Sequence, residues 1–417
     1  MGRKTLILTL IAVFVAFPVF AELESIKVGG QLRIRHYLKH RFDLDKTDTN
    51  DQNDYTETRA RLYFSADLTE NVFGKITTEN YLNPWQKEAT TDGNNTYLQE
   101  AYIQLKDVLG TMGYDMGIPL ELKIGRQFYS YGKYFLLAPL YGVDGVKATV
   151  DLKPFKADFF AYKLDETAAT ANDDRDLYGI WGTYSGITDW TFEPYLISRK
   201  DRDKGTTYTT GTPAVLTDRN ERRLTYGLRT SGKPITNLSV WADLAMQDGT
   251  DLGKEVDAFG CWLGGTYTFA DMTYKPALTL QYMYGSGDKD TTDSKDKAFD
   301  QLYEFVEWGY TFDPKLSNLH IISACGALKL TDALSVALNY YNYRQDEKST
   351  TVTGDITAAP AGLKKDLGDE LDLVFTYKYT ADVSTELYLA YFDPGKAYAS
   401  TRREEAFSVR AHMQLDF

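Results

Sequence analysis

Apolar and polar residues alternate along most of this chain after residue 21, and this period of two constrains the fold more than any other feature. In residues 406–417 one parity is apolar from Phe407 to Phe417, while the other reads Ser, Arg, His, Gln and Asp. Successive side chains of a strand point to opposite faces, so this segment has one apolar face and one polar face. The pattern predicts an all-β protein.

The same alternation recurs at residues 57–64, 146–152 and 371–379. Aromatic residues make up 14% of the chain, yet its mean hydropathy is -0.39. Such a balance is typical of strands with one face in lipid and the other in water. A large soluble β-sandwich or barrel shares this composition. Aromatic residues at 341–343, 377–379 and 391–392 lie near expected strand ends, where interfacial girdles form.

The N-terminus has the pattern of a secretory leader. Arg3 and Lys4 precede an apolar run from Leu6 to Phe20. Ala21 follows this run and is the expected last residue of the leader. The run is shorter than the ~20 residues that a spanning helix needs. We therefore predict that residues 1–21 form a cleavable signal peptide, and after residue 21 no stretch is apolar for long enough to be a spanning helix.

Connections between the expected strands alternate in length. Short links fall at 69–71, 185–189, 231–234 and 380–382, and long ones at 43–54, 83–96, 200–220, 285–317, 346–368 and 394–404. Short periplasmic turns and long outer loops are typical of outer-membrane barrels. We predict that residues 22–417 form one transmembrane, up-and-down antiparallel β-barrel of about 18 strands, with both termini in the periplasm. The apolar stretch 299–312 is assigned to an outer loop that can fold into the lumen.

Three short motifs follow one another in residues 122–150: Gly125-Arg126-Gln127, Tyr131-Gly132 and Asp144-Gly145-Val146. Near the C-terminus, LGDELDLVFTYKY at 367–379 is followed by YFDPG at 391–395. In this order the motifs resemble the alginate-export family of outer-membrane porins. The resemblance implies a Gram-negative outer-membrane barrel with the strand number counted above. The chain departs from the family pattern at 133–136 and at Lys147, where family members often carry arginine.

Sorting the strands by parity places many charged side chains on the predicted lumen face. Arginine offers planar, forked donors for carboxylates and sugar hydroxyls, and a cationic pore wall favours anions. Four arginines on the first two strands are expected to form one patch. The predicted pore-lining and substrate-binding residues are Arg33, Arg35, Arg59, Arg61, Lys75, Glu79, Glu100, Arg126, Asp144, Lys147, Arg223 and Arg229.

The same arginines have a second possible role, as ion-pair partners that fill and stiffen the lumen wall. The carboxylates available for such pairs are Glu57, Glu79, Glu100 and Glu121. The two roles are compatible, because a porin constriction often has arginines on one wall and carboxylates on another.

Arg126 poses a separate problem. Alternation from Leu122 and Ile124 points it toward lipid, where an arginine costs roughly 2–4 kcal/mol at mid-depth. A β-bulge at Gly125 would turn the side chain into the lumen. We expect such a bulge, because the Gly-Arg pair belongs to the motif that resembles the family.

Composition and spacing argue against several other functions. The net charge of -13 argues against a nucleic-acid partner. The four histidines lie far apart and no Gly-x-Ser-x-Gly elbow occurs, so we predict no enzyme. Cys261 and Cys325 indicate neither a disulfide framework nor a zinc site, and no cofactor is predicted. The acidic loops 43–54 and 285–290 lack EF-hand spacing and are interpreted as solvated, with divalent cations as a possible bridge to lipopolysaccharide.

Three functions stay open at this stage. The first is a channel for passive diffusion of polar, anionic small solutes such as sugar acids or oligosaccharides. The second is an export pore for an acidic, alginate-like polysaccharide, and the third is a non-conducting surface or adhesin barrel. The expected partners are the solute, outer-membrane lipid and lipopolysaccharide. A further partner is the barrel-assembly machinery, which would read the C-terminal strand ending in Phe417.

Overall fold

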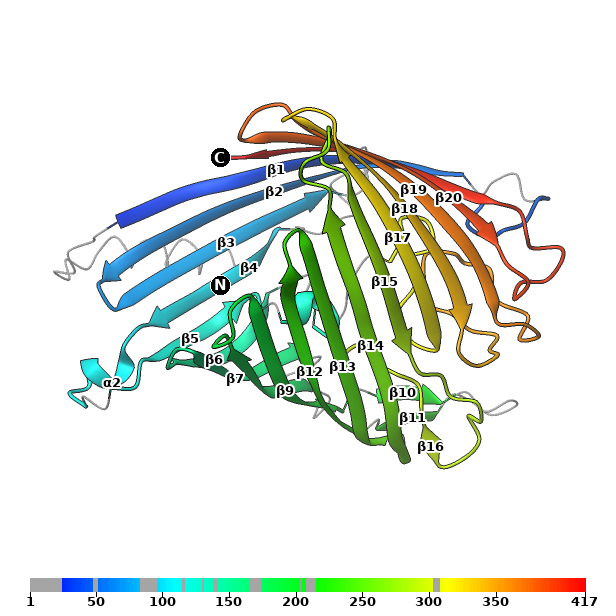
Figure 1. Cartoon of the computed structure of the whole chain (residues 1–417). Helices are drawn as coiled ribbons and strands as arrows, with labels where there is room; N and C mark the ends of the chain where they lie inside the picture. The colour runs from blue at the N-terminus through cyan, green and yellow to red at the C-terminus, as the bar shows by residue number, and fades with distance from the viewer. Residues whose placement is uncertain are drawn as a thin grey trace, which may run out of the picture.

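The chain forms a closed antiparallel barrel of 18 strands, as the sequence predicted (Figure 1). A computed structural model describes residues 25–47, 52–82, 96–114, 117–129, 131–137, 142–165, 174–202, 204–207, 215–218, 220–302 and 308–417. Each strand pairs with its neighbours in the chain, and pairing of the first strand with the last closes the barrel. The predicted signal peptide, residues 1–21, lies outside the described residues and stays a prediction.

The wall consists of strands that are mostly between eight and eighteen residues long. These are β1 (Ser25–His40), β2 (Gln52–Thr69), β3 (Val72–Leu82), β4 (Thr96–Leu105), β5 (Leu120–Gln127), β6 (Val143–Asp151), β7 (Phe155–Asp165), β8 (Arg175–Tyr184), β9 (Trp190–Asp201), β12 (Glu221–Ile235), β13 (Leu238–Asp251), β14 (Lys254–Thr268), β15 (Ala277–Gly285), β17 (Leu319–Lys329), β18 (Leu334–Gln345), β19 (Asp366–Lys378), β20 (Val383–Pro394) and β21 (Ala406–Asp416). The remaining elements belong to connections: α2 (Val108–Thr111), the 3-10 turn η1 (Gly132–Tyr134), β10 (Lys204–Thr207), β11 (Val215–Asp218) and β16 (Lys295–Asp296).

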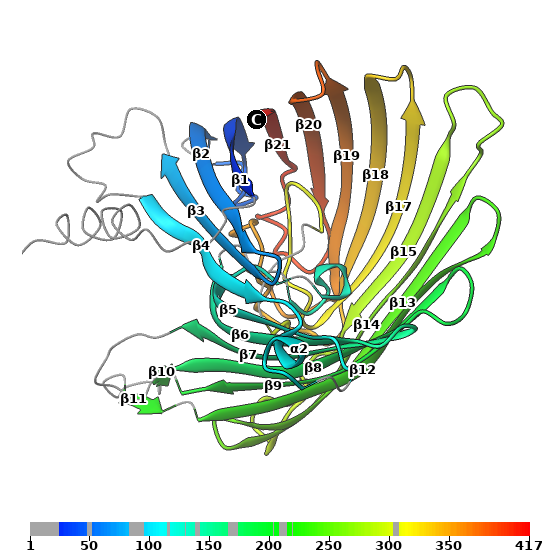
Figure 2. The ribbon, with the colours of Figure 1, turned by 90° about the vertical axis from the view of Figure 1, so that its left-hand side faces the viewer.

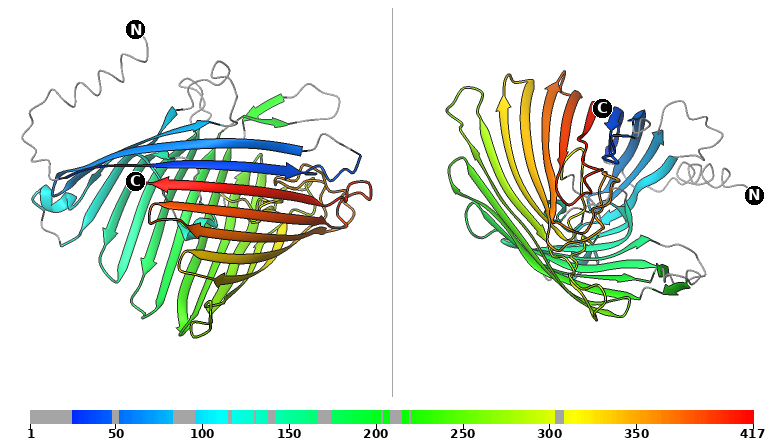
Figure 3. Two further views of the ribbon diagram at one scale, coloured as in Figure 1. Left: turned by 90° about the horizontal axis from the view of Figure 1, so that it is seen from above. Right: turned by 90° about the vertical axis from the view of Figure 1, so that its right-hand side faces the viewer.

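The two ends of the barrel differ in their connections. At one end, here the turn end, β2–β3, β8–β9, β17–β18 and β19–β20 are joined by short links, and β1 begins beside the end of β21 (Figure 3). At the other end, here the loop end, long segments follow β9, β15 and β18. The link between β13 and β14 is an exception, since only Leu252 and Gly253 join these strands at the loop end.

The two faces of the wall follow the alternation of the sequence. In β12, Glu221, Arg223 and Thr225 are buried toward the lumen, while Leu224 and Tyr226 are exposed on the outer face. This order is expected of a barrel whose outer face meets lipid. No described helix is long and apolar enough to cross a membrane.

The lumen contains a packed loop, which we call the lumen loop and define as residues 286–302 and 308–318 between β15 and β17. Figure 2 shows this yellow segment inside the ring of strands. Phe299 and Phe312 are fully buried, and Phe299 lies 5.7 Å from the ring of Phe135, which belongs to the connection after β5. Folding of the stretch 299–312 into the lumen is therefore confirmed for its described residues.

The aromatic girdle prediction is only partly right. Tyr377 and Tyr391 are exposed on the outer face, as a girdle requires. Tyr343 and Phe392 are instead fully buried, and both pack against Phe312 of the lumen loop. Their parity in β18 and β20 points inward, so closeness to a strand end alone is not enough to place a ring in the lipid interface.

Candidate functional site

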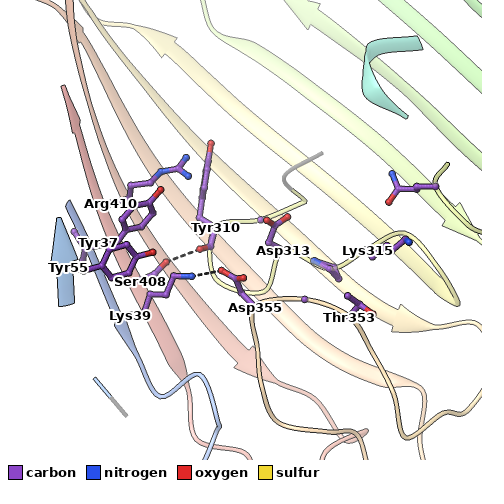
Figure 4. A pocket seen from close by; sticks show the side chains of 15 residues that line it. Tyr37, Lys39, Tyr55, Tyr310, Asp313, Lys315, Thr353, Asp355, Ser408 and Arg410 are labelled. Atoms are coloured by element: carbon purple, nitrogen blue, oxygen red, sulfur yellow. Dashed lines mark hydrogen bonds and ion pairs between the residues drawn. The ribbon is translucent and has the colours of Figure 1, made fainter. Parts of the chain in front are cut away.

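A cavity of about 370 Å³ lies between the lumen loop and the wall formed by β1, β2 and β21 (Figure 4). We call it the lumen cavity. Segments far apart in the sequence meet there, because the lumen loop and the β18–β19 connection both fold against this part of the wall. Its side chains that can bind a polar solute are Tyr37, Lys39, Tyr55, Gln301, Tyr310, Asp313, Lys315, Thr353, Asp355, Ser408 and Arg410.

Cations and hydroxyl groups dominate the polar lining of the lumen cavity. The ammonium of Lys39 lies 2.5 Å from a carboxylate oxygen of Asp355. The guanidinium of Arg410 lies over two rings that contact each other at 4.4 Å, at 4.6 Å from the centroid of Tyr310 and 4.2 Å from that of Tyr388. Contact with aromatic rings attracts a guanidinium and holds it in place.

The lumen cavity continues into a band of basic side chains nearer the turn end. Tyr37 marks the join: its ring stacks on Tyr55 at 4.8 Å, and its hydroxyl accepts a 2.7 Å hydrogen bond from Arg35. We call this band the cationic wall and define it by its lumen-facing bases. They are Arg33, Arg35, Arg59, Arg61, Lys75, Lys123 and Lys147, on β1, β2, β3, β5 and β6.

Carboxylates in the cationic wall are shared between bases. Glu57 lies 3.2 Å from Arg33 and 3.8 Å from Arg35. Glu79 is shared in the same way by Arg61, which it contacts directly, and by Arg59 at 3.9 Å.

Further along the band, Lys75 has a carboxylate partner of its own, Glu100 at 2.6 Å. Lys123 and Lys147 face each other on β5 and β6 as cross-strand partners. Among the residues that the structure describes, the seven bases of the cationic wall therefore outnumber Glu57, Glu79 and Glu100, the carboxylates that pair with them. Both roles predicted for these residues occur together, since the side chains line the lumen and also form ion pairs.

A different set of arginines is deeply buried on the opposite part of the wall. We call Arg199, Arg223 and Arg229 the buried arginine cluster. Arg223 pairs with Glu221 at 2.7 Å and with Asp296 of the lumen loop at 3.2 Å.

The other two arginines of this cluster are paired as well. Arg229 pairs with Glu193 at 3.1 Å and with Asp243 at 3.7 Å, and Arg199 contacts Asp300 of the lumen loop. Here the carboxylates outnumber the arginines, so these side chains hold the lumen loop and the wall together.

Asp300 is the carboxylate through which the lumen loop meets this cluster. Burial alone would raise the pKa of Asp300, but Arg199, Lys315 and Arg223 around it hold that pKa well below its usual range. The carboxylate is therefore ionised at any pH at which the barrel is expected to work.

Glu370 of β19 is a second anchor of the lumen loop, separate from the buried arginine cluster. The backbone N–H groups of Tyr310 and Thr311 donate to Oε1 at 2.6 and 2.7 Å, and that of Phe312 donates to Oε2 at 3.0 Å. Gly309 makes this approach possible, because its φ of 128° suits glycine and a Cβ there would lie 2.3 Å from the hydroxyl of Tyr343.

Comparison with known proteins agrees with this architecture. Residues 24–411 match the alginate export family. The chain belongs to that family. The match covers almost the whole barrel, so the resemblance seen in short sequence motifs is confirmed.

The fold of this alginate export family member is also found in solved outer-membrane proteins. OpdK of Pseudomonas aeruginosa is 11% identical with a TM-score of 0.59, and the match covers 95% of this chain and 99% of that one. OccK11 (OpdR) of the same organism is 13% identical at a TM-score of 0.58, with 95% and 96% covered. OccAB4 of Acinetobacter baumannii is 12% identical at 0.57, with 95% and 99% covered. A search of curated proteins finds no match.

These findings establish a porin-like barrel of the Gram-negative outer membrane. The family and the similar structures are of the channel type rather than enzymes.

The prediction that Arg126 and Asp144 line the pore is wrong, because both side chains lie on the outer face of this family member. The pairing of β5 with β4 and with β6 runs in register through Gly125, so no bulge turns Arg126 inward. Arg126 instead pairs with Asp144 at 2.5 Å. Gly125 serves close strand packing, since a Cβ there would lie 2.3 Å from the backbone oxygen of Ala101. The pair lies at the end of β5 and the beginning of β6, at the loop end and away from mid-depth, and this placement lowers the cost of the charges.

The other predicted residues point into the lumen, but in two groups. The cationic wall brings together Arg33, Arg35, Arg59, Arg61, Lys75, Glu79, Glu100 and Lys147, whereas Arg223 and Arg229 lie in the buried arginine cluster.

Several residues of the lumen cavity, and Lys123 of the cationic wall, were missed by the sequence analysis. Parity could have found three of these residues. Lys39 shares the parity of Arg33 and Arg35, Lys123 lies between Leu122 and Ile124, and Arg410 lies on the polar parity of the last strand. Lys315 and Asp355 belong to long connections, where no periodicity indicates which way a side chain points.

Proposed function

We propose that the chain is a channel through which polar, anionic small solutes such as sugar acids or short oligosaccharides diffuse passively. The observation that carries the proposal is the excess of bases over carboxylates along the cationic wall. Glu57 and Glu79 each serve two arginines, so part of the positive charge stays available to a passing anion. A ring or band of such charge lowers the barrier for anions and raises it for cations.

The lumen cavity supports a small solute as cargo. Its volume of about 370 Å³ suits one or a few sugar units, and it offers Lys39, Lys315 and Arg410 together with tyrosine hydroxyls. Basic groups suit a carboxylate, and hydroxyls and aromatic faces suit the sugar ring. Asp355 and Asp313 also line the lumen cavity, and a mixture of acids and bases can orient a solute that has both charge and dipole.

We infer an orientation in which the turn end faces the periplasm and the loop end faces outward. Short periplasmic turns and longer outer loops are the usual arrangement in such barrels. In this orientation both termini are periplasmic. A solute that enters from outside the cell meets the lumen cavity before the cationic wall.

Solute flux into liposomes tests the proposal. Uptake of a monomeric uronic acid is expected to exceed that of a neutral hexose of similar size in vesicles that contain the barrel. Substitution of Arg33 and Arg35 by glutamine should remove most of this difference. Equal rates for the acid and the neutral sugar in the unmodified protein would contradict the proposal.

Export of an acidic polysaccharide is the second candidate, favoured by membership of the alginate export family. The same liposome assay separates the two when a series of uronic acid chains of increasing length is used. A small-solute channel should pass the monomer and exclude long chains, because the lumen loop fills much of the lumen. An export pore should admit long chains as well. A non-conducting surface barrel would show no single-channel steps in a planar bilayer.

We also infer that the C-terminal strand is read by the barrel-assembly machinery. Phe417 exchanges two backbone hydrogen bonds with Gly30, at 2.8 and 3.0 Å, so the last residue completes the seam between β21 and β1. Deletion of Phe417 should lower the amount of folded barrel in the outer membrane, measured by heat-modifiable migration on gels. Unchanged folded amounts would contradict this role.

A further inference from the structure

A continuous row of charged side chains crosses the outer face near the loop end. Each member is the direct cross-strand partner of the next, so the row lies at one height on the wall. We call it the outer charge row. Its members, from β5 to β12, are Arg126, Asp144, Lys163, Asp176, Lys200 and Arg222.

The charge balance changes along this row. Its first four members neutralise one another: Arg126 pairs with Asp144 at 2.5 Å, and Lys163 pairs with Asp176 at 3.2 Å. Its last two members, Lys200 and Arg222, are adjacent cations and cross-strand partners. Within the part of the chain that the structure describes, no carboxylate lies within ion-pair distance of either, and Lys200 lies 5.3 Å above the ring of Tyr178.

An apolar groove of about 450 Å³ lies directly below the row on the side of the turn end. We call it the outer-face groove. Its lining combines small residues, including Ala148, Ala161 and Ser198, with large ones such as Phe159 and Leu196. Ala161 and Ser198 lie two residues before Lys163 and Lys200 in their strands, so groove and row are contiguous.

We propose that this face binds one molecule of phosphorylated glycolipid from the outer leaflet, namely the lipid A part of lipopolysaccharide. A lipid A phosphate lies on Lys200 and Arg222, and an acyl chain lies in the outer-face groove. The inference goes beyond the proposed channel function and rests only on its orientation, with the loop end outward.

Three features select this occupant. The row lies where the apolar outer face ends, which is the level of lipid headgroups. Two adjacent bases without carboxylate partners match a phosphate, the anionic group of lipid A. The groove adjoins both bases on their membrane side, since Ser198 and Leu224 of its lining lie two residues from Lys200 and Arg222 along β9 and β12. Its lining is almost wholly apolar, as contact with an acyl chain requires. A second copy of the barrel fits less well, since its own row would place like charges against Lys200 and Arg222.

Native mass spectrometry of the detergent-purified barrel, with lipid A as the probe, tests the site. The expected result is one lipid A bound per barrel, with affinity at least about tenfold lower in the Lys200→Glu, Arg222→Glu double variant, because two attractive charges become repulsive. Lys233→Glu is the matched control, since Lys233 is an exposed base at the turn end of the same strand, and it should leave binding unchanged.

A second pair of variants tests the groove. Ala161→Phe places a large side chain in the lining of the groove and should weaken lipid A binding severalfold. The control Ala60→Phe, on the outer face of β2, should leave binding unchanged. Lipid A without its phosphates should bind as weakly as lipid A binds to the double variant.

Three results would overturn the proposal: equal lipid A affinity in the double variant, equal affinity for phosphatidylglycerol, or a barrel oligomer that Ala161→Phe dissociates. The substituted residues all lie outside the lumen, so single-channel conductance should stay unchanged. A failure of the lipid site is therefore distinguishable from a failure of the proposed channel.

Discussion

The cationic wall and the buried arginine cluster use the same residue type for opposite purposes. In the cationic wall Arg33 and Arg35 share one carboxylate, and 11% and 16% of their side-chain surface stays exposed. In the buried arginine cluster Arg223 has four carboxylates within 4 Å and is 2% exposed. An arginine that shares a carboxylate and keeps part of its side chain exposed can therefore contact a solute. An arginine that is buried among several carboxylates stabilises the fold instead.

The largest expected effect is on stability. Arg223→Ala leaves Glu221, Asp251, Asp296 and Asp300 without a shared cation inside the protein. Removal of one member of a buried ion pair costs about 3–5 kcal/mol of the free energy of unfolding. Urea unfolding in detergent, followed by tryptophan fluorescence, measures this loss.

The matched variant Arg61→Ala removes a more exposed arginine from the cationic wall. It should cost only about 1 kcal/mol, because Arg61 is partly exposed and Arg59 stays beside Glu79 when Arg61 is removed. Equal costs for the two variants would abolish the distinction between the two regions.

The next effect concerns the anchor of the lumen loop. Glu370→Ala removes the acceptor of three backbone N–H groups, at Tyr310, Thr311 and Phe312. We expect the lumen loop to leave the wall of β19 and single-channel conductance to rise by about twofold, since three hydrogen bonds of about 0.5–1.5 kcal/mol each are lost together. Asp369→Asn, one residue away on the outer face, should not change conductance. A conductance that stays the same in both variants would show that the anchor does not restrict the pore.

A smaller effect is expected from removing a carboxylate of the cationic wall. Glu57→Gln frees Arg33 and Arg35 from their shared partner, so the preference for anions should increase, by less than about a factor of two. The reversal potential in a salt gradient reports the change. Glu193→Gln, beside the buried Arg229, should leave the potential unchanged, and a shift of the same size there would argue against two distinct regions.

The smallest effect is that of pH on the stability that Asp300 contributes, which should stay almost constant above about pH 4.5. Its pKa is depressed in the folded barrel, so the stability that its ionisation contributes is fully present above the unfolded pKa. That stability is lost only as the pH falls through the folded pKa. The difference in unfolding free energy between the unmodified barrel and Asp300→Asn should change by less than about 0.3 kcal/mol between about pH 7 and about pH 4.5. A difference that halves by about pH 5 would show that the buried arginine cluster does not hold this carboxylate ionised.

Alternation alone predicted the barrel and the lumen side of most charged residues. Arg33, Arg61 and Lys147 each lie between apolar neighbours, so parity places them without any tertiary information. The strand number followed from the alternation of short and long links, because that alternation reflects the two different ends of a barrel.

Parity could not separate the two groups of arginines. Arg223 is buried by Asp296 and Asp300, which are more than seventy residues away and belong to a loop without periodicity. The prediction for Arg126 was wrong for a different reason. Its motif suggested a bulge, whereas strict alternation without the motif places the side chain on the outer face, as observed. The local sequence pattern thus predicted the strands of the wall. Long-range packing of the lumen loop determines which arginines of the wall are buried and which line the solute path.

The reversal potential of the barrel in a planar bilayer under a salt gradient tests the central claim most directly. The unmodified protein should be anion-selective, and joint replacement of Arg33, Arg35, Arg59 and Arg61 by glutamate should reverse the sign of the potential. A cation-selective unmodified barrel, or a potential that the four replacements leave unchanged, would contradict the assignment of the cationic wall to the solute path.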